Sequence, residues 1–313
     1  MNISNLSELI NAEILNEGSI SSVLGFALSL DEVKPGFAFF TKDKEEAKQA
    51  ILKGAFCIIS TVELEILDKE LFYLIVQDLE SALFRLLRFL SEEKALNFVL
   101  CDSFELDFAK AFSLKILSGN VLNDFKELIN AKNNSFFFAL SEKYLLKLCA
   151  NFKRLKSVKF ELLNTSSLFF TSLVCDENLY FKNLKFPYVY AEIFAKFVFF
   201  IRENKLNLSF NEKKLDFLKI YFVDSSNKFC EFGTSSRAFL LAKNESHFEF
   251  LSKSLKHIKG FKIALKNSLF CDFSYANLEN LLEFKDFSYC LILENETLFE
   301  EIFLKENKTQ SLF

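Results

Sequence analysis

The chain has 313 residues, of which 50% are hydrophobic and 26% charged, and its formal net charge is −4. Length and composition exclude a disordered chain and a single small domain, and they predict two or three globular domains. The acidic balance argues against nucleic acid as the main partner, because phosphate binding needs an excess of lysine and arginine.

Cysteine and histidine usage predicts a reduced, cytoplasmic protein without a metal site. The seven cysteines are widely spaced, form no C-x-x-C pair and mostly lie in apolar runs. Neither histidine has a cysteine at metal-ligand spacing. The N-terminus has no basic region followed by an apolar core, so we expect no signal peptide.

The most apolar segment runs from Phe186 to Leu206. Its apolar span is shorter than the roughly twenty residues that a bilayer requires. Glu192 and Lys196 interrupt it four residues apart and form one polar stripe with Glu203. The segment therefore predicts a helix buried on most sides in a globular core, and no membrane span.

The first third of the chain alternates strands with helices. A helix between two strands is favoured by acidic residues at its start, at 43, 45 and 46, and by Gly54 just after its end. Asp78 is expected to cap a second, long helix. The predicted elements are a helix near 4–12, strands at 36–41, 55–60, 71–76 and 97–101, and helices at 42–54 and 79–94.

The remaining two thirds continue this alternation, with one antiparallel interruption. Ser141 is expected to cap a helix, and the period-two pattern at 157–185 predicts antiparallel strands with a turn at "CDEN", residues 175–178. The other predicted elements are a helix at 142–155, the buried helix from Phe186, and strands at 134–140, 218–224, 228–232, 238–242, 261–265 and 289–293. The order predicts an α/β fold with largely parallel sheets.

Four motifs carry a family resemblance: "VKPGFAFF" at 33–40, "AILKGA" at 50–55, "FCIIS" at 56–60 and "VQDLESALFRLL" at 76–87. Their order resembles the Mur ligases of the MurE and MurF type, ATP-dependent enzymes that add amino acids or peptides to UDP-N-acetylmuramic acid. The N-terminal unit also resembles the UDP-sugar-binding domain of the LpxD-type acyltransferases, although no hexapeptide repeat follows it. The resemblance is clearest over residues 20–101.

The resemblance implies a Mur-ligase-like architecture of three domains. Residues 1–75 would form a UDP-sugar-binding-like domain, residues 76–215 a degenerate ATPase-like domain, and residues 216–313 a small Rossmann-like domain. The predicted ligand-binding residues of the first domain are Ser29, Thr41 and Lys42.

The phosphate-binding apparatus of the family is missing from this sequence. After the strand at 97–101 the family carries G-x-x-G-K-[ST], whose backbone N–H groups wrap the phosphates. Here "DSFELDFAKAF" places Asp102, Glu105 and Asp107 where a triphosphate would lie, and no G-K-[ST] occurs in the chain. Like charges at such distances repel, so binding of ATP by that loop is not expected.

Two further family positions are altered. The family's D-S-R is replaced by Ser29, Leu30 and Asp31, so the hydroxyl expected near the diphosphate is lost. Its His-Asn pair at the buried helix is replaced by Pro187 and Tyr188, which removes a typical nucleotide contact.

A polar turn in the C-terminal third is the best candidate for binding a small anion. Hydroxyl, N–H and guanidinium groups there could bind phosphate or carboxylate. The residues are Thr234, Ser235, Ser236 and Arg237. The alternative is an ordinary turn between strands with a solvated Arg237.

Other candidate chemistry is sparse. His247 and His257 would lie roughly 15 Å apart along a helix, which favours two separate surface histidines over one shared site. Asp224 ends a predicted strand, where a carboxylate is either catalytic or a turn cap. No G-x-S-x-G elbow is present.

We therefore predict a catalytically degenerate Mur-ligase-like protein that needs no cofactor. It would bind a UDP-sugar, such as a UDP-muramyl peptide, or a protein of the cell-wall pathway. Two alternatives are an active ligase or transferase with an atypical nucleotide site, and a protein-binding scaffold. An exposed apolar patch outside any pocket would favour the scaffold.

Overall fold

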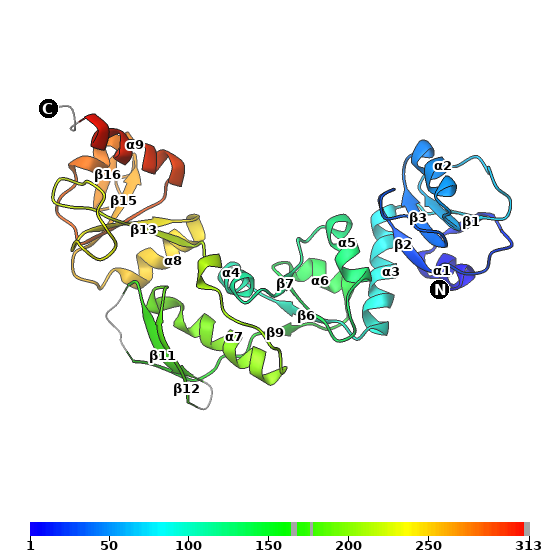
Figure 1. Cartoon of the computed structure of the whole chain (residues 1–313), viewed down its shortest axis with the longest axis horizontal. Helices are drawn as coiled ribbons and strands as arrows, with labels where there is room; N and C mark the ends of the chain where they lie inside the picture. Colours follow the sequence, from blue (N-terminus) through cyan, green and yellow to red (C-terminus); the bar gives the residue numbers. More distant parts are fainter. Residues whose placement is uncertain (164–167, 176–177, 310–313) are drawn as a thin grey trace. The chain divides into compact units, whose positions relative to one another are not determined.

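The computed structural model describes residues 1–163, 168–175 and 178–309. Part of the predicted 175–178 turn lies outside these residues. The chain forms two compact units (Figure 1): unit 1 comprises residues 1–109 and 114–155, and unit 2 comprises residues 110–113 and the chain from Lys156 onward. The division into three domains stays a prediction.

Unit 1 begins with a five-stranded sheet in the order β1-β5-β4-β3-β2. Strands β2 to β5 are parallel, and β1 is antiparallel to β5. The strands are β1 (Glu13–Asn16), β2 (Gly25–Ala27), β3 (Phe37–Thr41), β4 (Cys57–Ser60) and β5 (Phe72–Ile75), with helices α1 (Ile3–Ile10) and α2 (Lys44–Leu52). Because β2 ends the sheet, one of its edges is not paired with another strand.

The second part of unit 1 is a parallel sheet in the order β7-β8-β6-β9. Its elements are α3 (Leu79–Glu93), β6 (Asn97–Leu100), α4 (Ser103–Ala111), β7 (Lys115–Ile116), α5 (Val121–Ile129), β8 (Phe136–Ala139), α6 (Glu142–Leu148) and β9 (Lys153–Arg154). Helix α3 contacts α1, α5 and α6 (Figure 1). A single hydrophobic core joins the two sheets, in which Phe40 of β3 and Phe125 of α5 meet edge to face at 6.0 Å.

Unit 2 starts with a three-stranded antiparallel sheet, as the period-two pattern predicted. Its elements are β10 (Phe160–Leu162), β11 (Thr171–Cys175), β12 (Leu179–Leu184), the 3-10 turns η1 (Tyr188–Tyr190) and η2 (Glu212–Lys214), and α7 (Ala191–Glu203). Helix α7 is the predicted buried helix: Glu192 and Glu203 are exposed, whereas Phe194, Phe197 and Ile201 are buried. No helix among the described residues is long and apolar enough to cross a membrane.

The rest of unit 2 is a mixed sheet in the order β13-β14-β17-β15-β16, in which only β13 is antiparallel. Its elements are β13 (Leu218–Phe222), β14 (Ala238–Ala242), α8 (Glu245–Leu255), β15 (Phe261–Lys266), β16 (Phe273–Tyr275), η3 (Leu278–Glu283), β17 (Tyr289–Ile292) and α9 (Glu296–Thr309). Phe239 of β14 packs against Phe299 and Phe303 of α9. The predicted α/β class with largely parallel sheets is confirmed.

Two predicted elements are wrong. Residues 228–232 form no strand, and only a single bridge joins Val223 to Phe229, because a turn at Asp224 reverses the chain. The Asp224 carboxylate accepts hydrogen bonds from the N–H groups of Ser226 (2.8 Å) and Lys228 (2.9 Å), so it caps that turn. The helix predicted at 142–155 ends at Leu148, and residues 153–154 pair with β6 instead.

Candidate functional site

The connection from β6 to α4 is short and closed by its own carboxylates. Strand β6 ends at Leu100 and α4 begins at Ser103, so Cys101 and Asp102 are the whole connection. The Asp102 carboxylate accepts a hydrogen bond from the Glu105 N–H (2.8 Å), and the Glu105 carboxylate accepts one from the Asp102 N–H (3.1 Å). This reciprocal cap uses donors that a phosphate would need.

A carboxylate also caps two other helices that follow parallel strands in unit 1, α2 and α3, whereas Asn120 and Ser141 cap α5 and α6. At α2, Asp43 accepts hydrogen bonds from the N–H groups of Glu45 (2.7 Å) and Glu46 (3.0 Å). At α3, Asp78 accepts one from the Ser81 N–H (2.8 Å). Hydrogen bonding from Ser81 lowers the pKa of Asp78, so the carboxylate stays ionised. Three helix N-termini thus carry a negative charge where anions otherwise bind.

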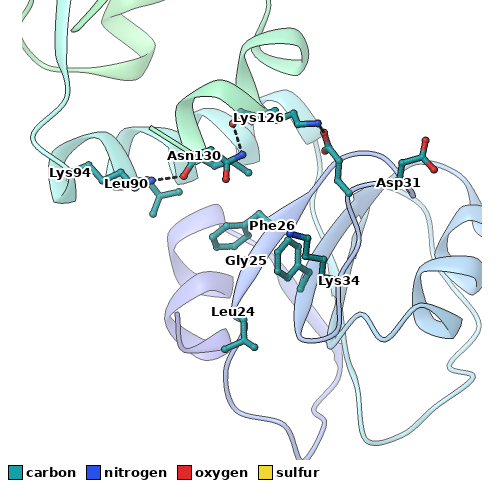
Figure 2. A pocket seen from close by; sticks show the side chains of 12 residues that line it. Leu24, Gly25, Phe26, Asp31, Lys34, Leu90, Lys94, Lys126 and Asn130 are labelled. Carbon is teal, nitrogen blue, oxygen red and sulfur yellow. Dashed lines mark hydrogen bonds and ion pairs between the residues drawn. The ribbon is translucent and has the colours of Figure 1, made fainter. Parts of the chain in front are cut away.

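A pocket of about 450 Å³ lies beside edge strand β2 (Figure 2). Three parts of the chain build it: the segment around β2 and the start of β3, the C-terminal end of α3, and the C-terminal end of α5. The lining residues are Leu24, Gly25, Phe26, Asp31, Glu32, Lys34, Phe37, Leu90, Lys94, Lys126, Ile129 and Asn130. We call it the β2 pocket.

The lysines of the β2 pocket differ in whether their ammonium groups already have partners within the protein. The Lys126 ammonium lies 2.7 Å from the Glu32 carboxylate, and the Lys94 ammonium donates to the carbonyl of Ile129 at the end of α5. Burial lowers the pKa of Lys94. Lys34 is exposed, and its ammonium has no hydrogen-bond or ion-pair partner among the described residues, although its carbonyl accepts a hydrogen bond from the Phe37 N–H (3.1 Å). Lys34 is therefore the cation most accessible to an anionic ligand.

Three of the chain's seven glycines build this end of the sheet. A Cβ on Gly25 would lie 2.6 Å from the Phe37 ring, and one on Gly36 would lie 2.7 Å from the Leu24 side chain. The Gly36 N–H donates to the carbonyl of Gly54 (2.8 Å), which ties the turn to the end of α2. The "VKPG" turn requires its glycine because Gly36 has a φ of 88° and lies in close contact with Leu24.

The predicted ligand residues of the N-terminal part do not line the β2 pocket. Ser29 and Lys42 are exposed, and Thr41 is buried at the end of β3, where its hydroxyl donates to the Glu46 carboxylate (2.7 Å). Their role in ligand binding stays a prediction. Lys34 was not among the predicted site residues, although it lies inside the quoted motif and was its only cation.

The polar turn at 234–237 is occupied by interactions within the protein. The Arg237 guanidinium donates to the carbonyls of Asp224 (2.9 Å) and Phe284 (2.7 Å), and it lies 4.4 Å from the centre of the Phe287 ring. Thr234 and Ser236 are exposed, while the Ser235 hydroxyl donates to the carbonyl of Val223 (2.6 Å). Arg237 joins three loops, and anion binding at this turn stays a prediction.

The prediction that both histidines lie on the surface is wrong for His247. Its side chain is fully buried, its Nδ1 lies 2.9 Å from the Tyr190 hydroxyl, and the Phe217 ring stacks on it. His257 is exposed, 2.9 Å from the Tyr188 hydroxyl. Both tyrosines belong to η1, which is distant in the sequence. The spacing of residues around His247 therefore could not predict that this side chain is buried.

Comparisons with known proteins return distant likenesses of fold. No family model and no curated protein matches the chain. The MurF ligase of Thermotoga maritima in complex with ADP is 10% identical, with a TM-score of 0.49 over 91% of this chain and 98% of that one. MurF from Acinetobacter baumannii is 11% identical, with a TM-score of 0.49 over 99% and 93%. A UDP-N-acetylmuramoyl-L-alanyl-D-glutamate–2,6-diaminopimelate ligase is 10% identical, with a TM-score of 0.44 over 92% of each chain. Likenesses this distant carry no evidence about activity.

Proposed function

We propose that this chain is a catalytically inactive, Mur-ligase-like cytoplasmic protein that binds a UDP-sugar precursor of peptidoglycan, such as a UDP-muramyl peptide. The observation that carries the proposal is the two-residue connection between β6 and α4, which is closed by Asp102 and Glu105. A triphosphate would have to displace both carboxylates from the helix N-terminus and would then face their charge. ATP-dependent ligation by the family's mechanism is therefore lost.

The β2 pocket supports the binding half of the proposal. Lys34 offers an unpaired ammonium group, and the Phe26 and Phe37 side chains offer apolar surface on which a base can stack. Lys126 would add a second cation once a diphosphate competed with Glu32 for it. An anion with an aromatic base is thus the ligand that these groups serve best.

Isothermal titration tests both halves. UDP-N-acetylmuramoyl-tripeptide is expected to bind, and Lys34→Ala is expected to weaken binding about tenfold, equivalent to about 1.4 kcal/mol. Lys69→Ala, an exposed lysine outside the pocket, is the matched control and should leave affinity unchanged. Lys42→Ala tests the earlier prediction for that residue.

Two results would contradict the proposal. The absence of heat with UDP-muramyl peptides would remove the precursor. Measurable ATP turnover, abolished by changes at 102–107, would favour the active ligase.

A specific observation favours a protein-binding scaffold as the second candidate. Leu269 and Phe270, in the loop between β15 and β16, are 93% and 94% exposed and line none of the pockets described here. Adjacent exposed side chains of this size are typical of an interaction site when they form part of a larger apolar patch. If the protein is a scaffold, neither nucleotides nor UDP-sugars will raise its melting temperature. Leu269→Ser with Phe270→Ser will abolish partner binding without lowering the melting temperature of the protein.

A further inference from the structure

A second hollow, of about 670 Å³, adjoins the β2 pocket. Leu24, Phe26 and Leu90 line both hollows, so the two share one apolar wall. Figure 2 shows these three side chains on the side of the β2 pocket away from Asp31. The other lining residues of the second hollow are Met1, Asn2, Asn5, Glu8, Leu9, Val23, Phe89 and Glu93. We call it the α1–α3 hollow.

The floor of the α1–α3 hollow exposes apolar side chains to water. Leu24 is 78% exposed and Phe89 is 42% exposed. Leu24 is held in this position by the backbone, because its N–H donates to the Gly36 carbonyl (2.8 Å) and its side chain lies directly over Gly36. An exposed apolar surface with a polar rim is typical of a binding site.

The balance of charge differs between the two hollows, with an excess of cations in the β2 pocket and an excess of carboxylates in the α1–α3 hollow. The β2 pocket contains Lys34, Lys94 and Lys126, together with Asp31 and Glu32, and Glu32 is paired with Lys126. The charged side chains of the α1–α3 hollow are both acidic, Glu8 and Glu93, and they outnumber the ammonium group of Met1, which donates to the Val23 carbonyl (2.8 Å). An anionic group is therefore favoured in the β2 pocket and disfavoured in the hollow beside it.

From this continuity we infer that the ligand is amphiphilic: its anionic head lies in the β2 pocket beside Lys34, and a flexible hydrocarbon arm lies across Leu24, Phe26 and Phe89 in the α1–α3 hollow. The inference rests on the proposed function and deepens it by adding an apolar arm to the anionic precursor. The arm is an acyl or prenyl chain joined to a phosphate or sugar phosphate, and these ligands share the anionic and apolar groups that contact the protein.

Titration of the whole chain with four simple probes tests the inference, at concentrations below micelle formation. Decyl phosphate is expected to bind at least tenfold more tightly than methyl phosphate, decanol or decyltrimethylammonium. Lys34→Ala is expected to weaken decyl phosphate at least fivefold. Leu9→Ser with Phe89→Ser, at two residues that line the α1–α3 hollow and not the β2 pocket, is expected to reduce decyl phosphate to the affinity of methyl phosphate, while leaving UDP-muramyl peptide binding unchanged.

Leu52→Ser is the matched control. Leu52 is 87% exposed on α2 and lines neither hollow, so its loss should change nothing. Circular dichroism of each variant confirms that it is folded. Two further probes, a long-chain and a short-chain acyl ester of UDP-glucose, distinguish an acylated sugar nucleotide from a simple lipid phosphate.

Each contrary result has a distinct meaning. If UDP-muramyl peptide binds but decyl phosphate binds no better than methyl phosphate, the apolar arm is refuted and the proposed function stands. If decyltrimethylammonium binds as well as decyl phosphate, the placement of an anionic head is refuted. If neither the precursor nor decyl phosphate binds, both proposals fail.

Discussion

Two connections in unit 1, the "VKPG" turn and the β6–α4 connection, differ in their use of glycine. At the "VKPG" turn, Gly36 has a positive φ, the chain reverses tightly and the β2 pocket lies beside Lys34. The β6–α4 connection contains no glycine, and Asp102 with Glu105 closes the helix N-terminus. Glycine is therefore present where the backbone conformation requires it and absent where carboxylates cap a helix.

This contrast separates two physical roles of glycine. Gly36 and Gly54 have φ angles of 88° and 89°, which most side chains rarely adopt, so folding itself selects them. The β6–α4 connection has no such requirement, because Cys101 and Asp102 join the strand to the helix without a glycine. Carboxylates that cap the helix then stabilise the fold at the same position.

The largest effect is expected for Gly54→Ala. Its Cβ would lie 3.1 Å from the Pro35 Cα in a left-handed backbone, so we expect the free energy of unfolding to fall by about 2 kcal/mol or more. Gly119→Ala is the matched control, with φ of +83° and no atom within 4 Å of the added Cβ. It should cost about 1 kcal/mol. Equal losses in urea-induced unfolding would show that close packing at the "VKPG" turn contributes nothing.

A smaller effect is expected for Asp102→Ala. The substitution removes the acceptor for the Glu105 N–H, which should lower the free energy of unfolding by about 1 kcal/mol. Asp102→Asn keeps a capping oxygen and should lose less. A stabilised Asp102→Ala variant would mean that this carboxylate serves a ligand and not the helix.

The smallest effect concerns pH. Because Ser81 lowers the pKa of Asp78 in the folded chain, the cap contributes stability above the ordinary carboxyl pKa of 3.8 and loses it as pH falls through the lower folded value. Asp78→Asn should remove this acid-dependent part, by less than about 1 kcal/mol. Melting temperatures of both proteins between pH 7 and pH 3 provide the measurement. Parallel curves would contradict the assigned role.

Local signals in the sequence were sufficient for much of the fold. Asp78 and Ser141 cap the helices that they were predicted to cap, and β14 spans the predicted residues 238–242. These elements depend on capping and on apolar runs, which neighbouring residues determine. Helix α5 was missed, and so was the short edge strand β2, which has only three residues.

The candidate site was less accessible to sequence reasoning. The β2 pocket joins residues near 24–37 to the ends of α3 and α5, which lie more than fifty positions away. His247 was misplaced for the same reason, since its partner Tyr190 is 57 positions earlier. Contacts of this range depend on how elements pack, and spacing along the chain does not encode them.

Hydrogen–deuterium exchange of the whole chain, with Mg·ATP or UDP-N-acetylmuramoyl-tripeptide added, tests the central contrast most directly. We expect the precursor to slow exchange in peptides that cover residues 24–37, 90–94 and 126–130, and we expect ATP to leave exchange at residues 101–111 unchanged. Slower exchange at 101–108 with ATP would show that the β6–α4 connection still binds a polyphosphate, and it would contradict the account.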